Sequence, residues 1–378
     1  MRILVNALSV DNISGRVVLL GHLKQIAGWT QSRHEFVVLH HTDNRDMVSD
    51  LGPHVTWLEV SRRCRKWWYR AWWERAHLPR LCQRRGIDCC FNPAGITYGN
   101  LSSQQVSFAQ NPWCLVPGLA HGPGERLKAA IQRRAYATAM RQARYMIFNS
   151  KFMESAYEAN ADCQARATKV IYQAIPESTF QQATQADCDP ANRERSVLCV
   201  SVMGSHKGIE TLVLAVAELA QRPNPARLKL VGGWPDANYR LKVEQLIKTH
   251  RITDRVEIAG HVSRDELEEC YAKSRVFALM SRCESFGIPA VEAQAFGTPV
   301  ISSNVCAIPE VCGDGGEFHD PDDVSGVAGA IANLMDDDEA WRGRSQKARD
   351  NAERFHWHIC SKPFLEVFND IEESVSPK

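Results

Sequence analysis

The amino-acid sequence predicts an α/β protein built from two doubly wound, Rossmann-like parallel sheets, one in each of two domains. The chain has 378 residues, which is long for one hydrophobic core and suits two domains of ordinary size. In both halves, short apolar runs alternate with longer helical stretches, a pattern typical of parallel strands joined by crossover helices. Between the halves lies a polar, proline-containing segment without apolar periodicity, which predicts an interdomain linker over residues 178–196.

The N-terminal domain is expected over residues 1–177. Ser14 and Gly15 follow the first apolar run, and RVVLLGHLKQIAG predicts a helix that ends near Gly28. A long helical stretch, GERLKAAIQRRAYATAMRQA, precedes the last predicted strand of this domain. The predicted strands, in chain order, are RILVNAL, HEFVVLHH, DCCFNPAG, QVSFAQNP and RYMIFNS.

The C-terminal domain is expected over residues 197–355. Its predicted strands include SVLCVSVM, RLKLVGG, RVEIAG, RVFALM and PVISS, separated by helical stretches such as GIETLVLAVAELAQ. The tail, residues 356–378, predicts an amphipathic helix that packs back towards the N-terminal domain. Ligands of open α/β sheets bind outside the carboxyl ends of the strands. We therefore expect the two domains to face a central cleft, which suits a reaction that joins two substrates.

Composition narrows the classes of function. The formal net charge is +1, so the whole chain offers no electrostatic footprint for nucleic acid. The thirteen cysteines include no Cys-x-x-Cys pair and no Cys/His spacing typical of zinc, which indicates unpaired thiols in a reducing cytosol. No apolar run approaches the roughly 18 residues of a membrane span, and the start of the chain lacks the features of a signal peptide. We therefore expect a soluble cytoplasmic protein.

Residues 281–303, SRCESFGIPAVEAQAFGTPVISS, hold two glutamates eight positions apart. The pattern predicts a loop after a strand and then a helix that begins near Pro289. Residues 285–287 would precede the helix N-terminus, whose unpaired N–H groups and positive dipole favour an anion such as a diphosphate. Glu284 would lie in the loop, and Glu292 about one turn into the helix, where a carboxylate can accept hydrogen bonds from two ribose hydroxyls. Either acid alone would be an ordinary surface acid.

Three further strand ends carry small or polar residues of the same kind. SHKGIETL places Lys207 at a strand-to-helix turn, where its ammonium could neutralise a diphosphate. LVGG ends another strand in a glycine pair, and IAGHVSRDEL places Gly260 and His261 at the end of a third. Taken together with the two glutamates, these strand ends describe a nucleotide-diphosphate site better than any one of them does.

Read in chain order, HKGIETL, LVGG, RVEIAGHV, ELEECYAKSRVFALMS and SRCESFGIPAVEAQAFGTPVISSNVCAIPEVCGD resemble the motifs of retaining glycosyltransferase family 4, the glycosyl transferases group 1. The last motif resembles the Glu-x7-Glu signature of that family, which has the GT-B fold. The resemblance covers the chain well from about Val197 to Trp357 and the first half loosely. It implies a nucleotide diphosphate sugar as donor, no cofactor and no obligatory metal, and a front-face displacement with retention and without a protein nucleophile.

The resemblance also implies a role for each motif residue. Lys207 would stabilise the departing diphosphate, Glu284 would contact the donor sugar, and Glu292 would bind the ribose hydroxyls. The other donor-binding candidates lie in the same loops and strand ends: Gly204, His206, Gly233, His261, Val262, Arg282, Ser285, Phe286, Gly287 and Ile288.

Two positions depart from the family pattern. Many members have an arginine five positions before the lysine, and this chain has Val202 there, so Arg282 or His206 supplies the second cation or donor binding is weaker. Many members also have a histidine where this chain has Gln110, whose amide can hydrogen-bond a sugar but cannot titrate. The candidate cleft residues of the N-terminal domain are Gly15, Gln110 and Asn111.

The segment 61–86 combines nine Arg and Lys residues with four tryptophans and a tyrosine. As a helix it would carry a broad aromatic band. Three interpretations stay open: the tryptophans fill the core beneath a solvated basic face, the helix lies in an anionic bilayer interface, or it grips an anionic lipid-pyrophosphate acceptor. Nucleic acid is disfavoured, because nothing else in the chain indicates a base-stacking platform.

The sequence therefore favours a glycosyltransferase that moves a hexose to a glycan acceptor in the biosynthesis of a cell-surface polysaccharide such as lipopolysaccharide. We expect a lipid-linked acceptor and a cytoplasmic enzyme that is peripheral on the inner face of the cytoplasmic membrane. Two alternatives stay open, a nucleotide-sugar 2-epimerase of the same fold and a catalytically silent nucleotide-sugar-binding partner of an assembly complex. A glycosidase is disfavoured, because its two carboxylates must flank one bond.

Overall fold

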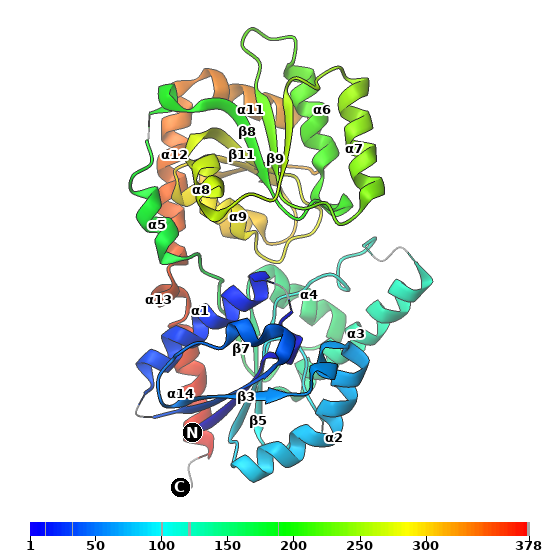
Figure 1. Ribbon diagram of the computed structural model, residues 1–378, viewed down its shortest axis with the longest axis vertical. Coiled ribbons are helices and arrows are strands. Elements are labelled where there is room, and N and C mark those ends of the chain that lie inside the picture. The colour runs from blue at the N-terminus through cyan, green and yellow to red at the C-terminus, as the bar shows by residue number, and fades with distance from the viewer. Residues whose placement is uncertain (12, 32, 100, 120–121, 188, 376–378) are drawn as a thin grey trace. The chain divides into compact units, whose positions relative to one another are not determined.

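The computed structural model describes residues 1–11, 13–31, 33–99, 101–119, 122–187 and 189–375. The chain divides into two compact units. Unit 1 comprises Met1–Ala174 and Trp357–Lys378, and unit 2 comprises Ile175–His356. Each unit contains one parallel sheet with helices packed against it, so the predicted α/β class with two doubly wound sheets is confirmed (Figure 1).

Unit 1 contains a sheet whose described strands follow the order β3-β2-β1-β4-β5-β6-β7, with every neighbouring pair parallel. The strands are β1 (Arg2–Asn6), β2 (Glu35–His41), β3 (Val55–Val60), β4 (Cys89–Asn92), β5 (Gln104–Ala109), β6 (Tyr145–Phe148) and β7 (Thr168–Val170). Successive strand residues face opposite sides of a sheet. In β4, Cys90 packs in the cluster that holds Leu78 of α2 (Trp67–Arg85), whereas the Phe91 ring contacts Phe364 of α14 (Pro363–Val375). Helices thus bury both faces, which explains the continuous apolar strands in the sequence.

The other helices of unit 1 are α1 (Ile13–Trp29), α3 (Pro123–Gln142), α4 (Lys151–Ala161) and α13 (Trp357–Cys360), with 3-10 turns η1 (Ala7–Ser9), η2 (Thr42–Met47) and η3 (Arg62–Arg65). The tail belongs to this unit. Two ion pairs, Arg144–Asp370 and Lys169–Glu366, each 2.6 Å long, tie α14 to the residue that precedes β6 and to β7. Trp357 packs so closely on α1 that a Cβ on Gly21 would lie 2.3 Å from its ring. The glycine is therefore required for α13 to approach α1.

Unit 2 contains a sheet whose described strands follow the order β10-β9-β8-β11-β12-β13. They are β8 (Glu194–Val200), β9 (Arg227–Val231), β10 (Val256–Gly260), β11 (Ser274–Leu279), β12 (Val300–Ser303) and β13 (Gly316–His319). The chain runs outwards from β8 to β10 and then returns to the other side of β8 with β11. The topological switch point therefore lies between the carboxyl ends of β8 and β11, where ligands of such sheets bind.

The helices of unit 2 are α5 (Glu177–Ala183), α6 (Ile209–Leu219), α7 (Ala237–Thr249), α8 (Arg264–Lys273), α9 (Ile288–Ala295), α10 (Ile308–Cys312), α11 (Val324–Asp336) and α12 (Asp338–Ala352). Four 3-10 turns, η4 (Pro190–Asn192), η5 (Ser205–Lys207), η6 (Gly313–Gly315) and η7 (Glu353–Phe355), complete it. Trp341 of α12 is fully buried, and its indole N–H donates to the carbonyl oxygen of Arg275 at 2.7 Å. This contact fixes α12 to the amino end of β11.

The segment 178–196, expected as a linker, instead forms part of unit 2. Its described residues contain most of α5, the turn η4 and the start of β8. Thr179 and Phe180 of α5 are buried, and the Arg193 guanidinium is buried among main-chain carbonyls, including that of Phe296 at 2.7 Å. This segment is polar in sequence, but its buried residues bind backbone that is distant along the chain. The boundaries between the units lie at 174/175 and 356/357.

Candidate functional site

The predicted donor-site residues gather at the switch point of the unit 2 sheet. The turn η5, with Lys207, follows β8, and the loop with Glu284 follows β11. These two strands are paired in the sheet, with Val197 opposite Val276. The two segments are therefore brought together by the strand order, although 77 positions separate the lysine from the glutamate.

Lys207 and Glu284 form an ion pair between Nζ and Oε1. Their side chains are only 14% and 16% exposed, so the pair is largely withdrawn from water. The Ser281 hydroxyl donates a second hydrogen bond to Glu284 Oε1 at 3.1 Å. A main-chain hydrogen bond also joins the two segments, because the N–H of Arg282 donates to the carbonyl oxygen of His206 at 2.7 Å. The arrangement holds one cation and one carboxylate at the end of the sheet.

Two glycines allow the close approach of these segments. Gly208 has φ +63°, and a Cβ there would lie 2.1 Å from the carbonyl oxygen of Met280 at the end of β11. Gly287 has φ +98° and precedes α9, which has no side-chain cap at its N-terminus. Both positions therefore need a residue without a side chain. The α9 N-terminus has Pro289 in its first turn, and the N–H of Ala290 donates to the carbonyl oxygen of Gly287 at 3.0 Å, so the anion site stays a prediction.

Glu292 has different partners from Glu284. Its side chain is 7% exposed, and Oε1 accepts from Arg264 Nη1 at 2.7 Å while Oε2 accepts from the Tyr271 hydroxyl at 2.9 Å. Burial, and then the neighbouring Glu292, raises the pKa of Tyr271 well above its usual value, so the phenol remains a donor. The two acids of the Glu-x7-Glu pattern therefore occupy separate polar clusters, and no contact among the described residues pairs them as an acid and a base.

The remaining predicted donor-site residues fall into three groups. At η5, burial and then the nearby Lys207 lower the pKa of His206, whose ring packs against Gly204. At the ends of β9 and β10, a Cβ on Gly233 would lie 2.4 Å from His261 Nε2, so these two positions adjoin, and Val262 follows. Around α9, Phe286 is buried, while Ser285 and Ile288 are partly exposed.

The arginine that the family pattern places five positions before Lys207 is a valine in this chain. Val202 is 62% exposed at the position where an arginine is common. Arg282 forms an ion pair with Asp322 and is 38% exposed. His206 contributes little charge near neutral pH, because its pKa is lowered. Arg282 is therefore a better candidate than His206 for the second cation, because it carries a positive charge at neutral pH, although Asp322 competes for it.

The candidate cleft residues of unit 1 lie at its own sheet and helices. Gln110 follows β5, donates to the Pro93 carbonyl oxygen at 3.4 Å and accepts from Gln173 at 3.2 Å. The side chain of Asn111 accepts from the main-chain N–H of Trp113 at 3.0 Å. Gly15, expected in the loop that opens the first helix, is instead the third residue of α1. The helix begins earlier, at Ile13.

The segment 61–86 forms η3 and α2, and its tryptophans divide into two groups. Trp67, Trp68 and Trp72 are 60%, 56% and 55% exposed, so they do not fill the core. Trp73 packs against the cluster formed by residues of β1, β2, β4 and α2. The one acid of the segment, Glu74, is buried. The exposed basic residues of the segment are Arg62, Arg63, Arg65, Lys66, Arg75, Arg80, Arg84 and Arg85. The surface of α2 is thus aromatic and basic.

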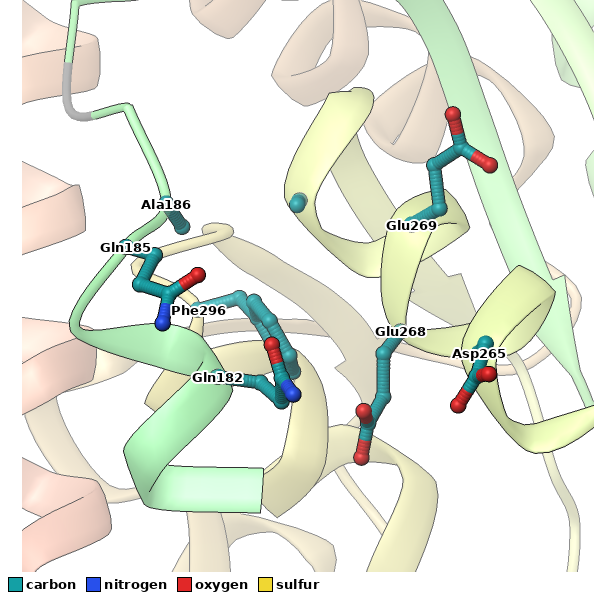
Figure 2. A pocket seen from close by; sticks show the side chains of 8 residues that line it. Gln182, Gln185, Ala186, Asp265, Glu268, Glu269 and Phe296 are labelled. Carbon is teal, nitrogen blue, oxygen red and sulfur yellow. The ribbon is translucent and has the colours of Figure 1, made fainter. Parts of the chain in front are cut away.

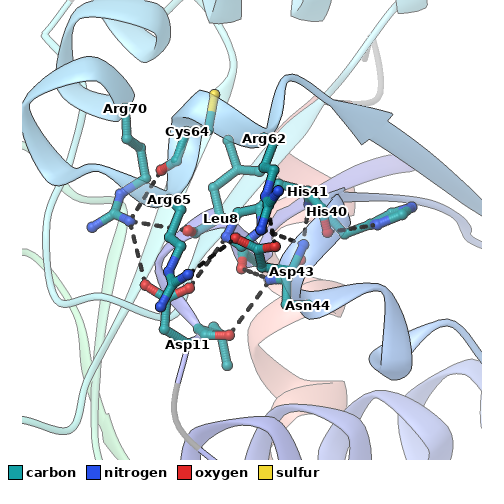
Figure 3. A network of polar contacts seen from close by, with 12 residues as sticks. Leu8, Asp11, His40, His41, Asp43, Asn44, Arg62, Cys64, Arg65 and Arg70 are labelled. Carbon is teal, nitrogen blue, oxygen red and sulfur yellow. Dashed lines mark hydrogen bonds and ion pairs between the residues drawn. The ribbon is translucent and has the colours of Figure 1, made fainter.

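A polar network joins this segment to the carboxyl ends of β1 and β2 (Figure 3). Arg62 and Arg65 both contact the Asp43 carboxylate, at 2.9 and 3.4 Å. Asp11 receives Arg70 at 3.8 Å and His41 at 3.2 Å. Burial lowers the pKa of His41, against the opposing influence of Asp11. The network orders the start of α2 on the sheet edge.

A cavity of about 250 Å³ lies between α5 and α8 (Figure 2). It is lined by Gln182, Gln185, Ala186, Asp265, Glu268, Glu269, Ala272 and Phe296. None of the predicted donor-site residues lines it. Over the described ranges, no group of three or more His, Cys, Asp or Glu side chains is arranged to hold a metal ion. Nor does the described part of the chain contain a helix with the length and apolar character needed to cross a bilayer.

Sequence reasoning missed Arg264, Tyr271 and Ser281, which contact the two glutamates. Two of these contacts join residues more than 20 positions apart, so no local pattern reveals them. Arg264 carried one signal. It is the first residue of α8, where the helix dipole disfavours a cation, and such a residue needs another reason to be there.

Known proteins resemble this chain in sequence and in fold. The family model for glycosyl transferases group 1 matches residues 181–354. The chain is 30% identical over 201 residues to the O-antigen chain mannosyltransferase B of Escherichia coli, covering 50% of this chain and 51% of the relative. It is 32% identical over 181 residues to N-acetyl-alpha-D-glucosaminyl L-malate synthase of Bacillus anthracis, covering 47% and 46%. The chain spans about half the length of the curated relatives it matches.

Solved structures show the same fold over nearly the whole chain. Sucrose-phosphate synthase from Thermosynechococcus elongatus superposes with a TM-score of 0.75 at 19% identity, covering 99% of this chain and 100% of that one. HepE from Anabaena, in complex with UDP and glucose, gives a TM-score of 0.72 at 19% identity, covering 98% and 100%. These likenesses establish the GT-B fold. Residues 181–354, which hold the candidate donor site, match the model of the glycosyl transferases group 1 family.

Proposed function

We propose that the protein is a retaining glycosyltransferase that moves a hexose from a nucleotide diphosphate sugar to a glycan acceptor. The observation that carries the proposal is the withdrawn Lys207–Glu284 pair at the switch point of the unit 2 sheet. A cation and a carboxylate at that edge, next to an uncapped helix N-terminus, suit a sugar joined to a diphosphate. The match of residues 181–354 to a glycosyltransferase family supports the same conclusion.

The proposed chemistry needs no protein nucleophile. The bond between the sugar C1 and the diphosphate oxygen breaks, while the acceptor oxygen bonds to the same face of C1. The acceptor's hydroxyl proton passes to the departing phosphate oxygen. Lys207 and the N-terminus of α9 stabilise the charge that develops on the leaving group, which is the task a metal performs in other enzymes. No obligatory metal and no cofactor are therefore proposed.

We assign each donor-site residue to one part of the donor. Glu284 accepts hydrogen bonds from the hexose hydroxyls, and its pair with Lys207 is exchanged when the diphosphate competes for the lysine. Glu292 accepts from the ribose. The other proposed contacts come from Gly204, His206, Gly233, His261, Val262, Arg282, Ser285, Phe286, Gly287 and Ile288. Gly15, Gln110 and Asn111 are proposed for the side of unit 1.

The comparisons suggest which substrates to try first. HepE was solved in complex with UDP and with UDP-glucose. Relatives and neighbours named for O-antigen and lipopolysaccharide outer-core transfer suggest a polysaccharide acceptor. We therefore propose a lipid-linked glycan as acceptor and a role in cell-surface polysaccharide biosynthesis.

We also propose that the enzyme works in the cytoplasm, peripheral to the inner face of the cytoplasmic membrane. The exposed tryptophans of α2 and the surrounding arginines are the residue types that bind an anionic bilayer interface. Flotation with liposomes that contain anionic lipid tests this. The triple variant of Trp67, Trp68 and Trp72 to serine should lose flotation, whereas Trp29→Ser, 41% exposed on α1, should keep it. If the wild-type protein does not float with these liposomes at low salt, the proposed membrane binding is wrong.

A radiolabelled-donor assay tests the activity itself. UDP-, GDP-, ADP- and TDP-sugars are first screened by thermal shift, because a bound ligand stabilises the folded state. With the best donor, wild-type protein should release sugar slowly, and Glu284→Gln should abolish the release. Lys207→Ala should weaken donor binding and lower turnover together. Glu269→Gln, an exposed acid on α8, is the matched control and should behave as wild type.

One observation favours a second candidate. Val202, exposed where the family often has an arginine, would suit a catalytically silent partner that binds a nucleotide sugar within an assembly complex. Donor binding without turnover, with every plausible acceptor supplied, would support this alternative and refute the transferase.

A further inference from the structure

The guanidinium of Arg264 connects three elements of unit 2. Its Nη1 donates to Glu292 Oε1 of α9 at 2.7 Å, its Nε to Glu268 Oε1 of α8 at 2.8 Å, and its Nη2 to the Thr179 hydroxyl of α5 at 2.5 Å. Each nitrogen thus has a different partner. These three contacts hold the guanidinium in one orientation, so the N–H that it donates to Glu292 has a fixed direction.

Helix stability alone does not explain Arg264. A cation in the first turn of a helix opposes the dipole, and an i,i+4 pair with Glu268 on a partly exposed face contributes little. The Glu292 carboxylate, by contrast, is 7% exposed, and a buried carboxylate requires compensating donors. The arginine is therefore better explained by Glu292 than by its own helix.

The hydrogen-bonding capacity of Glu292 is only half used by these contacts. A carboxylate offers about four acceptor sites, two on each oxygen. Arg264 takes one on Oε1, and Tyr271 takes one on Oε2. Within the described part of the chain, these contacts leave one acceptor site on each oxygen. Two neighbouring hydroxyls are the ligand chemistry that matches such a pair.

We propose that Arg264 is a positioning residue that, together with Tyr271, orients the Glu292 carboxylate so that each oxygen accepts from one hydroxyl of the donor's ribose. The inference rests on the proposed function, because it assigns Glu292 to the ribose. Arg264 itself does not touch the reacting atoms. Its removal should change recognition of the ribose and leave the sugar and diphosphate contacts at Glu284 and Lys207 in place.

The test compares nucleoside diphosphates with their 2′-deoxy counterparts. Binding of UDP and 2′-deoxy-UDP, GDP and 2′-deoxy-GDP, and ADP and 2′-deoxy-ADP is measured by calorimetry on the full chain. Wild-type protein should prefer the ribose form of its nucleotide by roughly ten- to a hundredfold, as expected for a hydrogen bond to a charged group. Arg264→Met and Glu292→Gln should each reduce this preference to about twofold. Arg264→Lys should restore part of it, because lysine is a cation without the fork.

Two further variants keep the test decisive. Tyr271→Phe removes one donor and should lower the preference without removing it. Lys273→Met removes an exposed cation of α8 that pairs with Glu269, and should leave the preference unchanged. Because Arg264→Met also removes a hydrogen-bond partner from Glu268 and from Thr179, folding is checked by circular dichroism. If that variant unfolds, Arg264→Lys and Tyr271→Phe carry the test.

The outcomes separate the inference from the proposed function. If Glu292→Gln abolishes the ribose preference and the folded Arg264 and Tyr271 variants retain it in full, the positioning role is wrong and the donor site stands. If wild-type protein binds both forms equally, or Glu292→Gln keeps the preference, the ribose assignment of Glu292 is wrong and the inference falls with it. If none of the nucleotides binds, the proposed function itself fails.

Discussion

The ion pair between Lys207 and Glu284 gives the sharpest prediction for stability. Lys207→Met removes the ammonium but keeps most of the volume of the side chain. It leaves Glu284 largely buried, with the Ser281 hydroxyl as the remaining hydrogen-bond partner of Oε1 among the described residues. Glu284→Gln leaves the lysine without its carboxylate. The double variant leaves no unpaired charge. A cycle of these three variants therefore measures the pair and not merely the loss of a side chain.

The expected magnitudes follow from burial. Removing one partner of a fully buried pair costs about 3–5 kcal/mol. Both side chains keep some access to water, at 14% and 16% exposure, so we expect about 2 kcal/mol for Lys207→Met. For a unit of this length that corresponds to a melting shift of roughly 4–8 °C. The double variant should be less destabilised than Lys207→Met alone, which gives a coupling of about 2 kcal/mol.

Hydrogen exchange read by mass spectrometry resolves the two units within one chain. Peptides from β8 and β11 report the opening of unit 2, and peptides from β1 and β4 report unit 1 as an internal control. Faster exchange should appear in unit 2 only. If the two single substitutions add in the double variant, or if Lys207→Met leaves β8 and β11 as protected as in the wild type, the pair does not exist in solution as described.

Three further perturbations are expected to have definite outcomes. Burial lowers the pKa of His22 to about 3, so below about pH 6.5 the unfolded chain binds a proton that the folded chain does not bind. The free energy of unfolding of unit 1 should therefore fall by up to about 1.4 kcal/mol per pH unit from pH 6.5 down towards 3. In urea titrations at acid pH, H22Q should lose less stability than the wild type. The neighbouring Cys283 thiol holds the pKa of Cys306 below its usual value, so iodoacetamide should modify Cys306 with a midpoint below that of an ordinary thiol, and C283A should raise that midpoint; an unchanged midpoint contradicts the assignment. Gly208→Ala should destabilise unit 2 and weaken donor binding, because its Cβ would meet Met280, whereas Gly329→Ala on α11, with nothing within 4 Å, should raise the melting temperature slightly.

The core of the fold was predictable because central strands carry their signal locally. The apolar runs of β1, β2, β8 and β11 are buried on both faces, and the sequence predicts all four. Strands β3, β7 and β13 are not among the predicted elements. Each lies at a sheet edge and is largely half-exposed, so its apolar pattern is weak.

The candidate site divides in the same way. Lys207 and Glu284 were predictable because each lies in the short connection after a strand, and strand order then brings them together. Arg193 and Arg264 act through partners far along the chain, which a local pattern cannot show. The polar character of 178–196 therefore indicated a linker, although Arg193 anchors it to unit 2. The helical spacing of Trp67 and the neighbouring tryptophans is compatible with a place in the core or on the surface. Only their exposure in the structure distinguishes these two positions.

The discontinuity of unit 1 has a consequence for the order in which the newly made chain can fold. Unit 2 is one continuous stretch, Ile175–His356, whereas the face of the unit 1 sheet that holds Phe91 and Phe108 is covered by Phe364 of α14. The ribosome makes roughly 5–20 residues per second, so unit 1 waits on the order of 10–40 seconds after residue 174 for its last helix. The half of the protein that is made first is thus the last to be completed. During that interval an uncovered aromatic sheet face is available to chaperones, or to another chain in the same state.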